Sequence, residues 1–271
     1  MLLVSFSGGR TSAFMANRLK RDYQHAFDMI FVFANTGQED ERTLVFADRC
    51  DKEWGLNLVW VEAVVHHDER KSCTHRIVTF ETASRRGEPF EEVIKKYGIP
   101  NKAFPHCTRE LKRNPIRSYQ NSIGWSDAWT AIGIRKDEPK RILENAMGER
   151  VVYPLVNLFP TTKPEILDWW KEQPFDLGLL DHQGNCTWCW KKSLKKHVRL
   201  YRESPRIFDF PARMEETYAL TGAGQMEGVK RTFFREYRST KDIITLAQLL
   251  NPGRLEFEEG DAGCSESCEV F

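Results

Sequence analysis

Short apolar runs alternate along the first part of the chain with longer segments that mix apolar and polar residues. The runs at 2–6, 29–34 and 58–65 are continuous and β-prone, which is typical of strands buried on both faces of a sheet. Between them, residues 12–19 and 39–54 place apolar side chains at helical spacing. Strands that alternate with helices predict a parallel sheet whose crossovers are right-handed.

The alternation resumes after a polar, irregular stretch at 66–112, which we expect to run over the edge of the sheet. Residues 128–134 form another apolar run, and 151–155 fit a further strand. Thr162 and Glu165 have the spacing of a capping box, so a tryptophan-bearing helix should begin there.

We expect an α/β domain over 1–203 and a helical extension over 204–271 that ends in a mobile tail. The domain would be an open, mostly parallel sheet with helices on both faces. In the extension, 230–238 interleaves arginine with Phe233, Phe234 and Tyr237. The spacing favours an amphipathic helix that packs its aromatics on the core. The alternative is a surface that grips phosphate and stacks on a base.

Composition and charge narrow the functional classes. The 271 residues carry a formal net charge of +1, so no broad electrostatic field draws the chain to nucleic acid or membrane. No apolar run approaches the roughly 20 residues that span a bilayer, and the start lacks the basic region of an export signal. We therefore expect a cytoplasmic protein. Its seven cysteines, an odd number, favour metal binding or redox chemistry over a disulfide framework.

A glycine-rich loop between the first strand and the first helix is the first candidate site. Its residues are Ser7, Gly8, Gly9, Arg10, Thr11 and Ser12. Glycines let the backbone approach an anion closely, and the start of a helix attracts negative charge. The loop lacks the Gly-Lys-Ser/Thr ending of a Walker loop. We expect it to bind phosphate, pyrophosphate or sulfate; the alternative is a plain tight turn.

Two more polar turns follow predicted strands. Asn35-Thr36-Gly37 comes after the second strand, and Gly133-Ile134-Arg135 comes after a later one. Ligands of open parallel sheets bind beyond the carboxyl ends of the strands, so the three turns should converge on one crevice. Arg135 would hold an anion in its fork of donors, although a solvated surface arginine is the simpler interpretation.

These motifs, in this order, resemble the PP-loop ATP pyrophosphatases, an adenine nucleotide alpha hydrolase-like superfamily. The nearest branch is the phosphoadenosine phosphosulfate (PAPS) reductase group, and the resemblance covers roughly residues 1–195. It implies that the loop grips phosphate or sulfate, the Thr-Gly turn touches adenosine, and the arginine segment holds the anionic end. The residues given these roles are Ser7, Gly8, Gly9, Ser12, Thr36, Gly37, Arg135 and Arg141. The sequence departs from the family at Thr11, where an aspartate is usual, and this departure puts ATP cleavage in doubt.

Three cysteines form the second constellation. Cys186 and Cys189 have the Cys-x-x-Cys spacing of two ligands to one metal or cluster, and His106 precedes Cys107. Basic neighbours at 109, 112, 191 and 192 should lower thiol pKa values and favour thiolates. Spacing alone leaves an iron–sulfur cluster, a zinc site, a redox pair and ordinary buried cysteines open.

The resemblance favours the cluster. Family members with an iron–sulfur cluster have a Cys-Cys pair, a similar gap and then Cys-x-x-Cys, and here His106 replaces the first cysteine. Cys107, Cys186 and Cys189 would then be three ligands of a four-iron, four-sulfur cluster. The fourth position is open or is filled by His106, Cys264 or Cys268, with Cys264 as our working choice.

The cysteine tail is the third feature. Sulfonucleotide reductases end in a tail whose cysteine attacks the sulfate sulfur, and Cys268 lies three residues from the end. The resemblance makes Cys268 a candidate nucleophile, with Arg135 as its catalytic partner on the anion. The neighbours Glu266 and Glu269 oppose a low thiol pKa unless the tail docks on a basic cleft. A tail disulfide, a cluster ligand and an inert terminus are the alternatives.

Three functions remain in competition. The first is a sulfonucleotide reductase that binds an adenine nucleotide and passes electrons from a thioredoxin-like thiol carrier. The second is an ATP-dependent sulfurtransferase acting on a nucleobase or nucleic acid, although a nucleic-acid partner is not favoured by the charge. The third is a non-catalytic nucleotide-binding module. We expect the reductase-like function, no membrane partner, and a chain compatible with homodimer formation.

Overall fold

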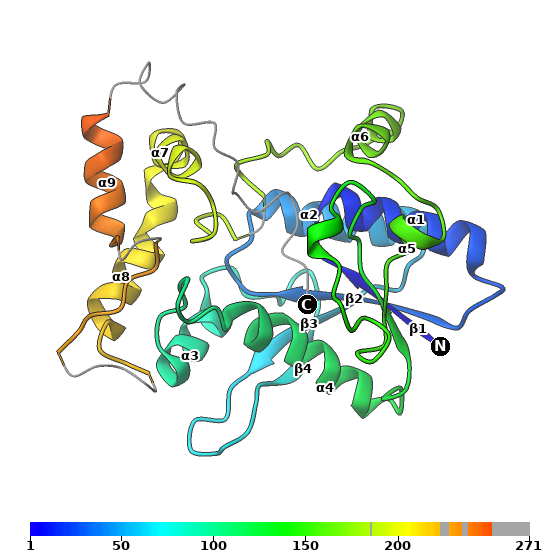
Figure 1. The fold of residues 1–271 in the computed structure, drawn as a ribbon, viewed down its shortest axis with the longest axis horizontal. Coiled ribbons are helices and arrows are strands. Elements are labelled where there is room, and N and C mark those ends of the chain that lie inside the picture. The colour runs from blue at the N-terminus through cyan, green and yellow to red at the C-terminus, as the bar shows by residue number, and fades with distance from the viewer. Residues whose placement is uncertain (185, 223–227, 235–237, 251–271) are drawn as a thin grey trace.

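The computed structural model describes residues 1–184, 186–222, 228–234 and 238–250 (Figure 1). At its centre is a six-stranded sheet with the strand order β4-β3-β2-β1-β5-β6. The strands are β1 (Leu2–Phe6), β2 (Met29–Asn35), β3 (Val59–Val64), β4 (Thr74–Val78), β5 (Trp129–Ala131) and β6 (Val151–Val152). Every neighbouring pair is parallel except β3 and β4. The predicted α/β fold with an open, mostly parallel sheet is therefore confirmed.

Helices cover both faces of this sheet, as Figure 1 shows. The helices over one face are α1 (Arg10–Tyr23), α2 (Glu41–Trp54) and α6 (Lys163–Lys171). The opposite face is covered by α4 (Asn114–Ser122) and by η1 (Arg109–Arg113), a π-helix. The remaining short elements of the α/β part are α3 (Glu88–Tyr97), η2 (Pro139–Arg141) and α5 (Pro154–Asn157).

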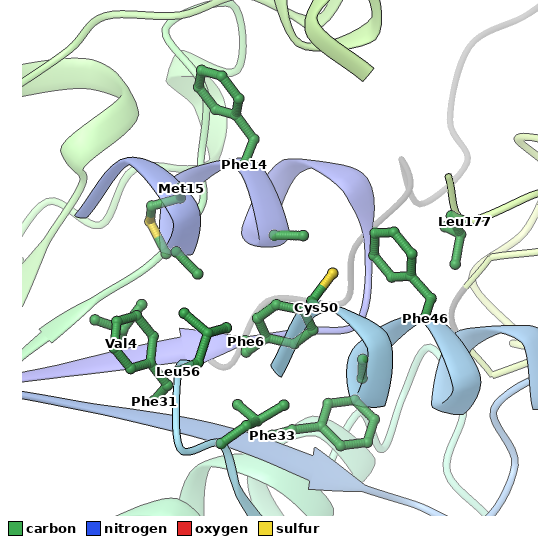
Figure 2. Packing of buried hydrophobic residues seen from close by; sticks show 14 of the residues in the cluster. Val4, Phe6, Phe14, Met15, Phe31, Phe33, Phe46, Cys50, Leu56 and Leu177 are labelled. Carbon is green, nitrogen blue, oxygen red and sulfur yellow. The ribbon is translucent and has the colours of Figure 1, made fainter. Parts of the chain in front are cut away.

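Alternation along the central strands explains the two layers. Val4 and Phe6 of β1 face α1 and α2, whereas Leu3 faces α4. Phe33 and Val32 of β2 divide in the same way, because successive strand side chains point to opposite faces. Figure 2 shows the first of these cores, in which strand phenylalanines meet side chains of α1 and α2. The central strands are therefore buried on both faces, as the continuous apolar runs predict.

Local signals set the helix ends. The carboxylate of Asp40 accepts a hydrogen bond from the Arg42 backbone N–H at the start of α2, and Gly55 ends that helix in the left-handed region at φ 58°. Thr162 and Glu165 form the predicted capping box at α6. A cap of this kind contributes about 1 kcal/mol, so these residues fix where each helix meets the sheet.

The stretch at 66–112 is more regular than we expected. It contains β4, α3 and η1, and β4 pairs antiparallel with β3 at the sheet edge. No residue of β4 is fully buried, and Ile77 is 63% exposed. An edge strand without a buried face has no apolar alternation, which is why the sequence pattern does not reveal it.

The C-terminal helices form a second core. They are α7 (Leu194–Glu203), η3 (Pro205–Phe208), α8 (Asp209–Tyr218) and α9 (Thr240–Leu249). They pack with α3 and with the Cys186–Cys189 segment, so the predicted helical extension is present. Because α7 packs on η3 and α9, the boundary expected at residue 203 falls between elements that share this core.

The prediction of a helix at 230–238 is wrong for residues 230–234, which the structure describes. Residues 230–234 are irregular, and an isolated bridge joins Phe234 to Arg238. The Glu215 carboxylate accepts a hydrogen bond from the backbone N–H of Phe233, so this group is satisfied without a helical hydrogen bond. The aromatic part of the prediction holds, because Phe233 and Phe234 are buried in the second core.

Candidate functional site

The carboxyl ends of β1, β2 and β5 lie at one edge of the sheet, because β2 and β5 each run parallel to β1. Chain order reverses direction across β1, with β2 on one side and β5 on the other. This is the topological switch point where open α/β sheets place their ligands. The three polar turns of the sequence follow these three strands, so the structure brings them to the same edge.

The glycine-rich loop is tied together by the Ser12 hydroxyl. Its oxygen accepts hydrogen bonds from Ser7 N (3.1 Å) and Ser7 Oγ (3.0 Å), and it donates to the Gly9 carbonyl (3.0 Å). Gly8 has φ +81°, and a Cβ at this position would lie 2.6 Å from Thr43 Cγ2. Glycine is therefore required here both by conformation and by space. Ser12 thus shapes the loop from within.

Helix α1 starts directly behind the loop. Gly9 is its N-cap in an extended conformation, with no side-chain cap and no acidic residue in the first turn among the residues described. The positive end of the helix dipole and the first backbone N–H groups therefore face the loop without a carboxylate competitor from that turn. This arrangement suits an anion.

Arg10 is directed elsewhere. Its guanidinium donates to both carboxylate oxygens of Asp176 (2.6 and 2.5 Å) and to the carbonyl of Leu179 (3.0 Å). These partners lie in the segment after α6 and line a pocket of about 730 Å³. In this structure the predicted nucleotide-binding Arg10 anchors that segment to α1.

Arg135 reaches the loop from the end of β5. It is 4% exposed, and its Nη1 donates to Thr11 Oγ1 (3.3 Å). Its Nε donates to Asp137 (3.0 Å), and its Nη2 lies 3.4 Å from Glu138. Gly133 lets the two turns touch, because a Cβ there would lie 3.3 Å from Ser12 Cα. A solvated surface arginine is therefore excluded for Arg135.

Arg141 lies at the end of η2 and is less enclosed. Its guanidinium pairs with Glu138, the carboxylate that also neighbours Arg135. Glu138 therefore joins the two predicted anion-binding arginines. An incoming phosphate or sulfate would compete with this carboxylate for both.

The turn after β2 is held by a buried carboxylate. Glu62 on β3 is fully buried, and it accepts from Asn35 Nδ2 (2.6 Å), Ser84 N (2.6 Å) and Arg76 Nη2 (2.6 Å). Asn35 Oδ1 in turn accepts from Gly37 N (3.2 Å). Glu62 therefore holds the side chain of Asn35 in place, and Asn35 in turn holds the Thr36-Gly37 turn.

Thr36 connects this turn to the cysteines. Its hydroxyl lies 2.8 Å from Glu39 Oε1 and 3.5 Å from Cys186 Sγ. Cys107, Cys186 and Cys189 line one pocket together with Thr36. The structure therefore gathers the three predicted cluster ligands beside the predicted adenosine turn, although Cys107 and Cys186 are 79 positions apart in the sequence.

Burial, more than the basic neighbours, governs the Cys186 thiol. Burial raises the pKa of Cys186 well above its ordinary value, the Glu39 charge acts in the same direction, and the Lys112 charge opposes both. Lys192 donates to the backbone carbonyls of Cys186 (3.2 Å) and Thr187 (2.7 Å). The prediction that nearby cations lower the thiol pKa is wrong for Cys186. Burial destabilises the thiolate more than the neighbouring cations stabilise it.

His106 takes no part in this pocket. It is 9% exposed, its Nε2 lies 3.2 Å from the Gly98 carbonyl, and its ring packs near Tyr97. Burial lowers the pKa of His106 to about 4. The alternative that His106 completes the cluster is therefore not favoured by its position.

The other cysteines divide into two groups. Cys50 lies in the core between α2 and the sheet, and Cys73 lies in the second core. Burial raises the pKa of each thiol, to about 12 for Cys73. Cys264 and Cys268, the predicted fourth ligand and nucleophile, lie outside the described residues.

Three residues of the site escaped the sequence interpretation. They are Gln38, Glu39 and Glu62. One carried a usable signal, because Glu62 is a lone charge inside the apolar run of β3, and a buried charge is rarely found without partners. The others are ordinary polar residues whose burial depends on segments distant in sequence.

The chain is 32% identical over 286 aligned positions to the uncharacterized nin region protein ORF290 of Escherichia phage lambda, covering 99% of this chain and 94% of that protein. The chain belongs to the family of this phage protein. It is also 25% identical to two uncharacterized proteins of Methanocaldococcus jannaschii over 218 and 194 residues, spanning 40% and 34% of their lengths. No family model matches the chain.

Two further observations concern the rest of the described structure. A mainly apolar pocket of about 390 Å³ lies at the opposite ends of β1 and β5, and none of the predicted site residues lines it. Within the described ranges, no helix is both long and apolar enough to cross a membrane.

Proposed function

We propose that this chain is a PAPS reductase-like enzyme that binds an adenine nucleotide at the β1 and β5 ends and performs sulfur chemistry at the adjoining cysteines. The observation that carries the proposal is the 3.5 Å separation between Thr36 Oγ1 and Cys186 Sγ. Thr36 belongs to the turn that the family resemblance assigns to adenosine, and Cys186 belongs to the predicted cluster. Nucleotide and reactive sulfur would therefore meet in one site.

The anionic end of the nucleotide would lie against the start of α1. Backbone N–H groups and the helix dipole favour phosphate or sulfate there. Arg135, held against Thr11, would supply a planar pair of donors to the same group. Because Arg135 already neighbours Asp137 and Glu138, an anion must displace at least part of that pairing. This competition favours ligands with strong negative charge.

Cys107, Cys186 and Cys189 are the residues that would hold an iron–sulfur cluster. Thiolates are the ligands that such clusters take, so the donor chemistry fits. No three His, Cys, Asp or Glu side chains within the described residues are grouped to hold a single metal ion. A cluster distributes its cysteines over several irons, whereas zinc gathers its ligands on one ion. The choice of a cluster over zinc therefore rests on the family resemblance. When bound, the cluster would tune charge and redox potential beside the substrate sulfur.

The pocket must open to admit such a group. Its volume is about 20 Å³, which is room for one water molecule. Cys107, Thr108 and Lys191 on its wall are only half-buried, whereas Cys186 and Trp188 are buried. Outward movement of the half-buried wall is therefore the route that disturbs the least packing.

The reductase chemistry needs one nucleophilic thiol besides these residues, and Cys268 is the candidate. Its thiolate would attack the sulfate sulfur, the bond from sulfur to the phosphate oxygen would break, and the nucleotide would leave with the electron pair. One thiolate of a dithiol carrier would then attack Sγ of Cys268, and sulfite would leave with the electron pair of the broken S–S bond. The second thiol of the carrier would resolve the mixed disulfide, which returns Cys268 as a thiol and leaves the carrier as a disulfide. The sulfur of the substrate is reduced by the two electrons that the dithiol loses.

A second candidate function is ATP-dependent sulfur transfer to a nucleobase or nucleic acid. The gathering of three cysteines directly beside the nucleotide turn favours it as much as it favours reduction. Thr11, in place of the usual loop aspartate, weighs against ATP cleavage. The two functions differ in their products, because one releases sulfite and the other splits ATP.

The test begins with anaerobic purification of the full chain, an optical spectrum, and iron, sulfide and zinc analysis. We expect about four irons per chain and a broad visible absorbance. Serine at Cys107, Cys186 or Cys189 should abolish iron binding, whereas Cys50→Ala and Cys73→Ala should retain it. Equal iron content in all five variants would remove the cluster from the proposal.

Activity separates the two functions. PAPS, its 3′-unphosphorylated form and ATP are each supplied with thioredoxin and its reductant, and sulfite, AMP and pyrophosphate are measured. Sulfite release that is lost in Cys268→Ser, with nucleotide binding retained, supports the reductase. AMP and pyrophosphate release from ATP without sulfite chemistry supports sulfur transfer instead. Unchanged activity in Cys268→Ser removes that thiol from the mechanism.

A further inference from the structure

Gln38 joins the nucleotide turn to the Cys-x-x-Cys segment. Its carbonyl oxygen accepts a hydrogen bond from Thr187 N (3.0 Å), and its side-chain Oε1 accepts one from Trp188 Nε1 (2.5 Å). Its Nε2 donates back to the Gly37 carbonyl (3.0 Å). Thr187 and Trp188 are the two residues between Cys186 and Cys189. The main chain and the side chain of Gln38 thus both join the predicted adenosine turn to the cysteine segment.

Neighbouring contacts extend this junction. An isolated antiparallel bridge pairs Glu39 with Cys186. The Glu39 carboxylate accepts from the backbone N–H of Thr36 (3.0 Å) and of Gln38 (3.2 Å). Hydrogen bonds therefore connect the residues of the turn from Thr36 to Glu39 with one another. Because Glu39 is paired with Cys186, a displacement of Cys186 would also displace this turn.

Trp188 makes the junction stiff. It is 1% exposed, and its ring lies 4.6 Å from the Phe233 ring, 5.3 Å from Phe90 and 5.7 Å from Phe210, measured between centroids. A buried indole needs an acceptor for its N–H, and Gln38 supplies that acceptor. Because the ring is enclosed by aromatic side chains, movement of the cysteine segment is passed to Gln38 instead of being absorbed by ring rotation.

We infer that Gln38 is a positioning residue through which the cysteine site and the nucleotide site are energetically coupled. An occupant that binds Cys186 and Cys189 fixes Trp188, and Trp188 fixes the turn that contacts the nucleotide. Both occupants would favour the same arrangement of Gln38 and Trp188, so the coupling is positive. By linkage, the nucleotide strengthens the cysteine-site occupant by the same factor. The inference rests on the proposed function for the existence of the two sites.

A purely structural role for Gln38 predicts a different result. If Gln38 only satisfies the buried indole, its loss lowers stability and weakens both ligands independently. If Gln38 carries coupling, its loss leaves each separate affinity nearly unchanged and removes the effect of one ligand on the other. The ratio of nucleotide affinities with and without a filled cysteine site therefore separates the two roles.

The experiment uses the full chain, freed of metal under anaerobic conditions. Cadmium ion fills the cysteine site as a soft, thiolate-selecting probe. ATP and PAPS are the nucleotide probes, and their dissociation constants are measured by calorimetry with and without cadmium. For the wild type we expect at least about fivefold tighter nucleotide binding when cadmium is bound.

Two variants test the residue itself. Gln38→Ala removes the side-chain acceptor, and Trp188→Phe removes the donor while keeping an aromatic ring. Each should lower the affinity ratio clearly below the wild-type value, with the separate constants changed less than about threefold. The double variant should show no further loss, because the two changes break the same bond. Gln24→Ala, at an exposed glutamine, should keep the wild-type ratio.

The outcomes are distinct. If cadmium and nucleotide both bind the wild type and cadmium does not change the nucleotide affinity, the coupling is overturned and the proposed function stands. A wild-type ratio that survives in both Gln38→Ala and Trp188→Phe overturns the role of Gln38. A wild-type protein that binds neither probe overturns the proposed function and this inference with it.

Discussion

The guanidinium of Arg135 donates to the hydroxyl of Thr11 across 3.3 Å and so joins the loop after β1 to the turn after β5. A neutral hydroxyl leaves more of the arginine charge for a ligand than a carboxylate would. Thr11 is therefore compatible with a loop that holds anions strongly.

Replacing Arg135 with lysine should separate phosphate affinity from adenosine affinity. Lysine keeps the charge but loses the planar fork, so we expect ATP to bind at least about tenfold more weakly. Adenosine, which carries no phosphate, should bind within about twofold of the wild type. Calorimetry of both ligands checks this. Arg18→Lys, at a surface ion pair with Asp22, is the matched control and should change neither.

Alanine at Gly8 should destabilise the fold more than alanine at Gly55. Both glycines have positive φ, which costs about 1 kcal/mol for alanine. A Cβ at Gly55 meets nothing within 4 Å, whereas one at Gly8 would lie 2.6 Å from Thr43 Cγ2. We therefore expect about 3 kcal/mol at Gly8, once crowding is added. Urea unfolding measures both, and equal losses would contradict the close packing of the loop.

The sequence was informative wherever a residue's partners could be inferred from strand order. The strands β1, β2 and β3 were recognisable because both of their faces are buried, and their ends located the three turns. The meeting of Cys107 with Cys186 could be expected only from family resemblance. Spacing gives the Cys-x-x-Cys pair, but it does not place a cysteine 79 positions earlier.

Two failures have identifiable physical causes. The segment 230–238 has aromatic residues at helical spacing. The carboxylate of Glu215 nevertheless accepts the backbone N–H of Phe233, and residues 230–234 form no helix. Cys186 has cations nearby in sequence, yet burial raises its pKa. Both outcomes depend on tertiary contacts that a local pattern does not contain.

Glutamine at Glu62 should loosen the turn after β2. Its amide would place donors opposite the donors of Asn35 and Ser84, so at least one buried polar group loses its partner. We expect a loss of about 2–3 kcal/mol in unfolding free energy. Nucleotide affinity should fall as well, because Asn35 then no longer fixes Gly37. Glu53→Gln, in an exposed pair with Arg49, should cost less than about 0.5 kcal/mol.

His106 should make the protein less stable as the solution becomes mildly acidic. Burial lowers the pKa of its native imidazole to about 4, whereas the unfolded value is about 6.5. Between these values the unfolded chain binds a proton that the native protein excludes, so stability falls as pH drops through this window. The total loss should approach about 3 kcal/mol.

Urea unfolding of metal-free protein at steps from pH 7 to pH 4 checks this dependence. In His106→Gln the titrating group is gone, while an amide donor remains to reach the Gly98 carbonyl. Its stability should therefore decline less steeply over the window, by up to about 1.4 kcal/mol for each pH unit. His25→Gln, at an exposed histidine, should keep the wild-type slope. Parallel curves for wild type and His106→Gln would mean that the buried imidazole is protonated in the native protein.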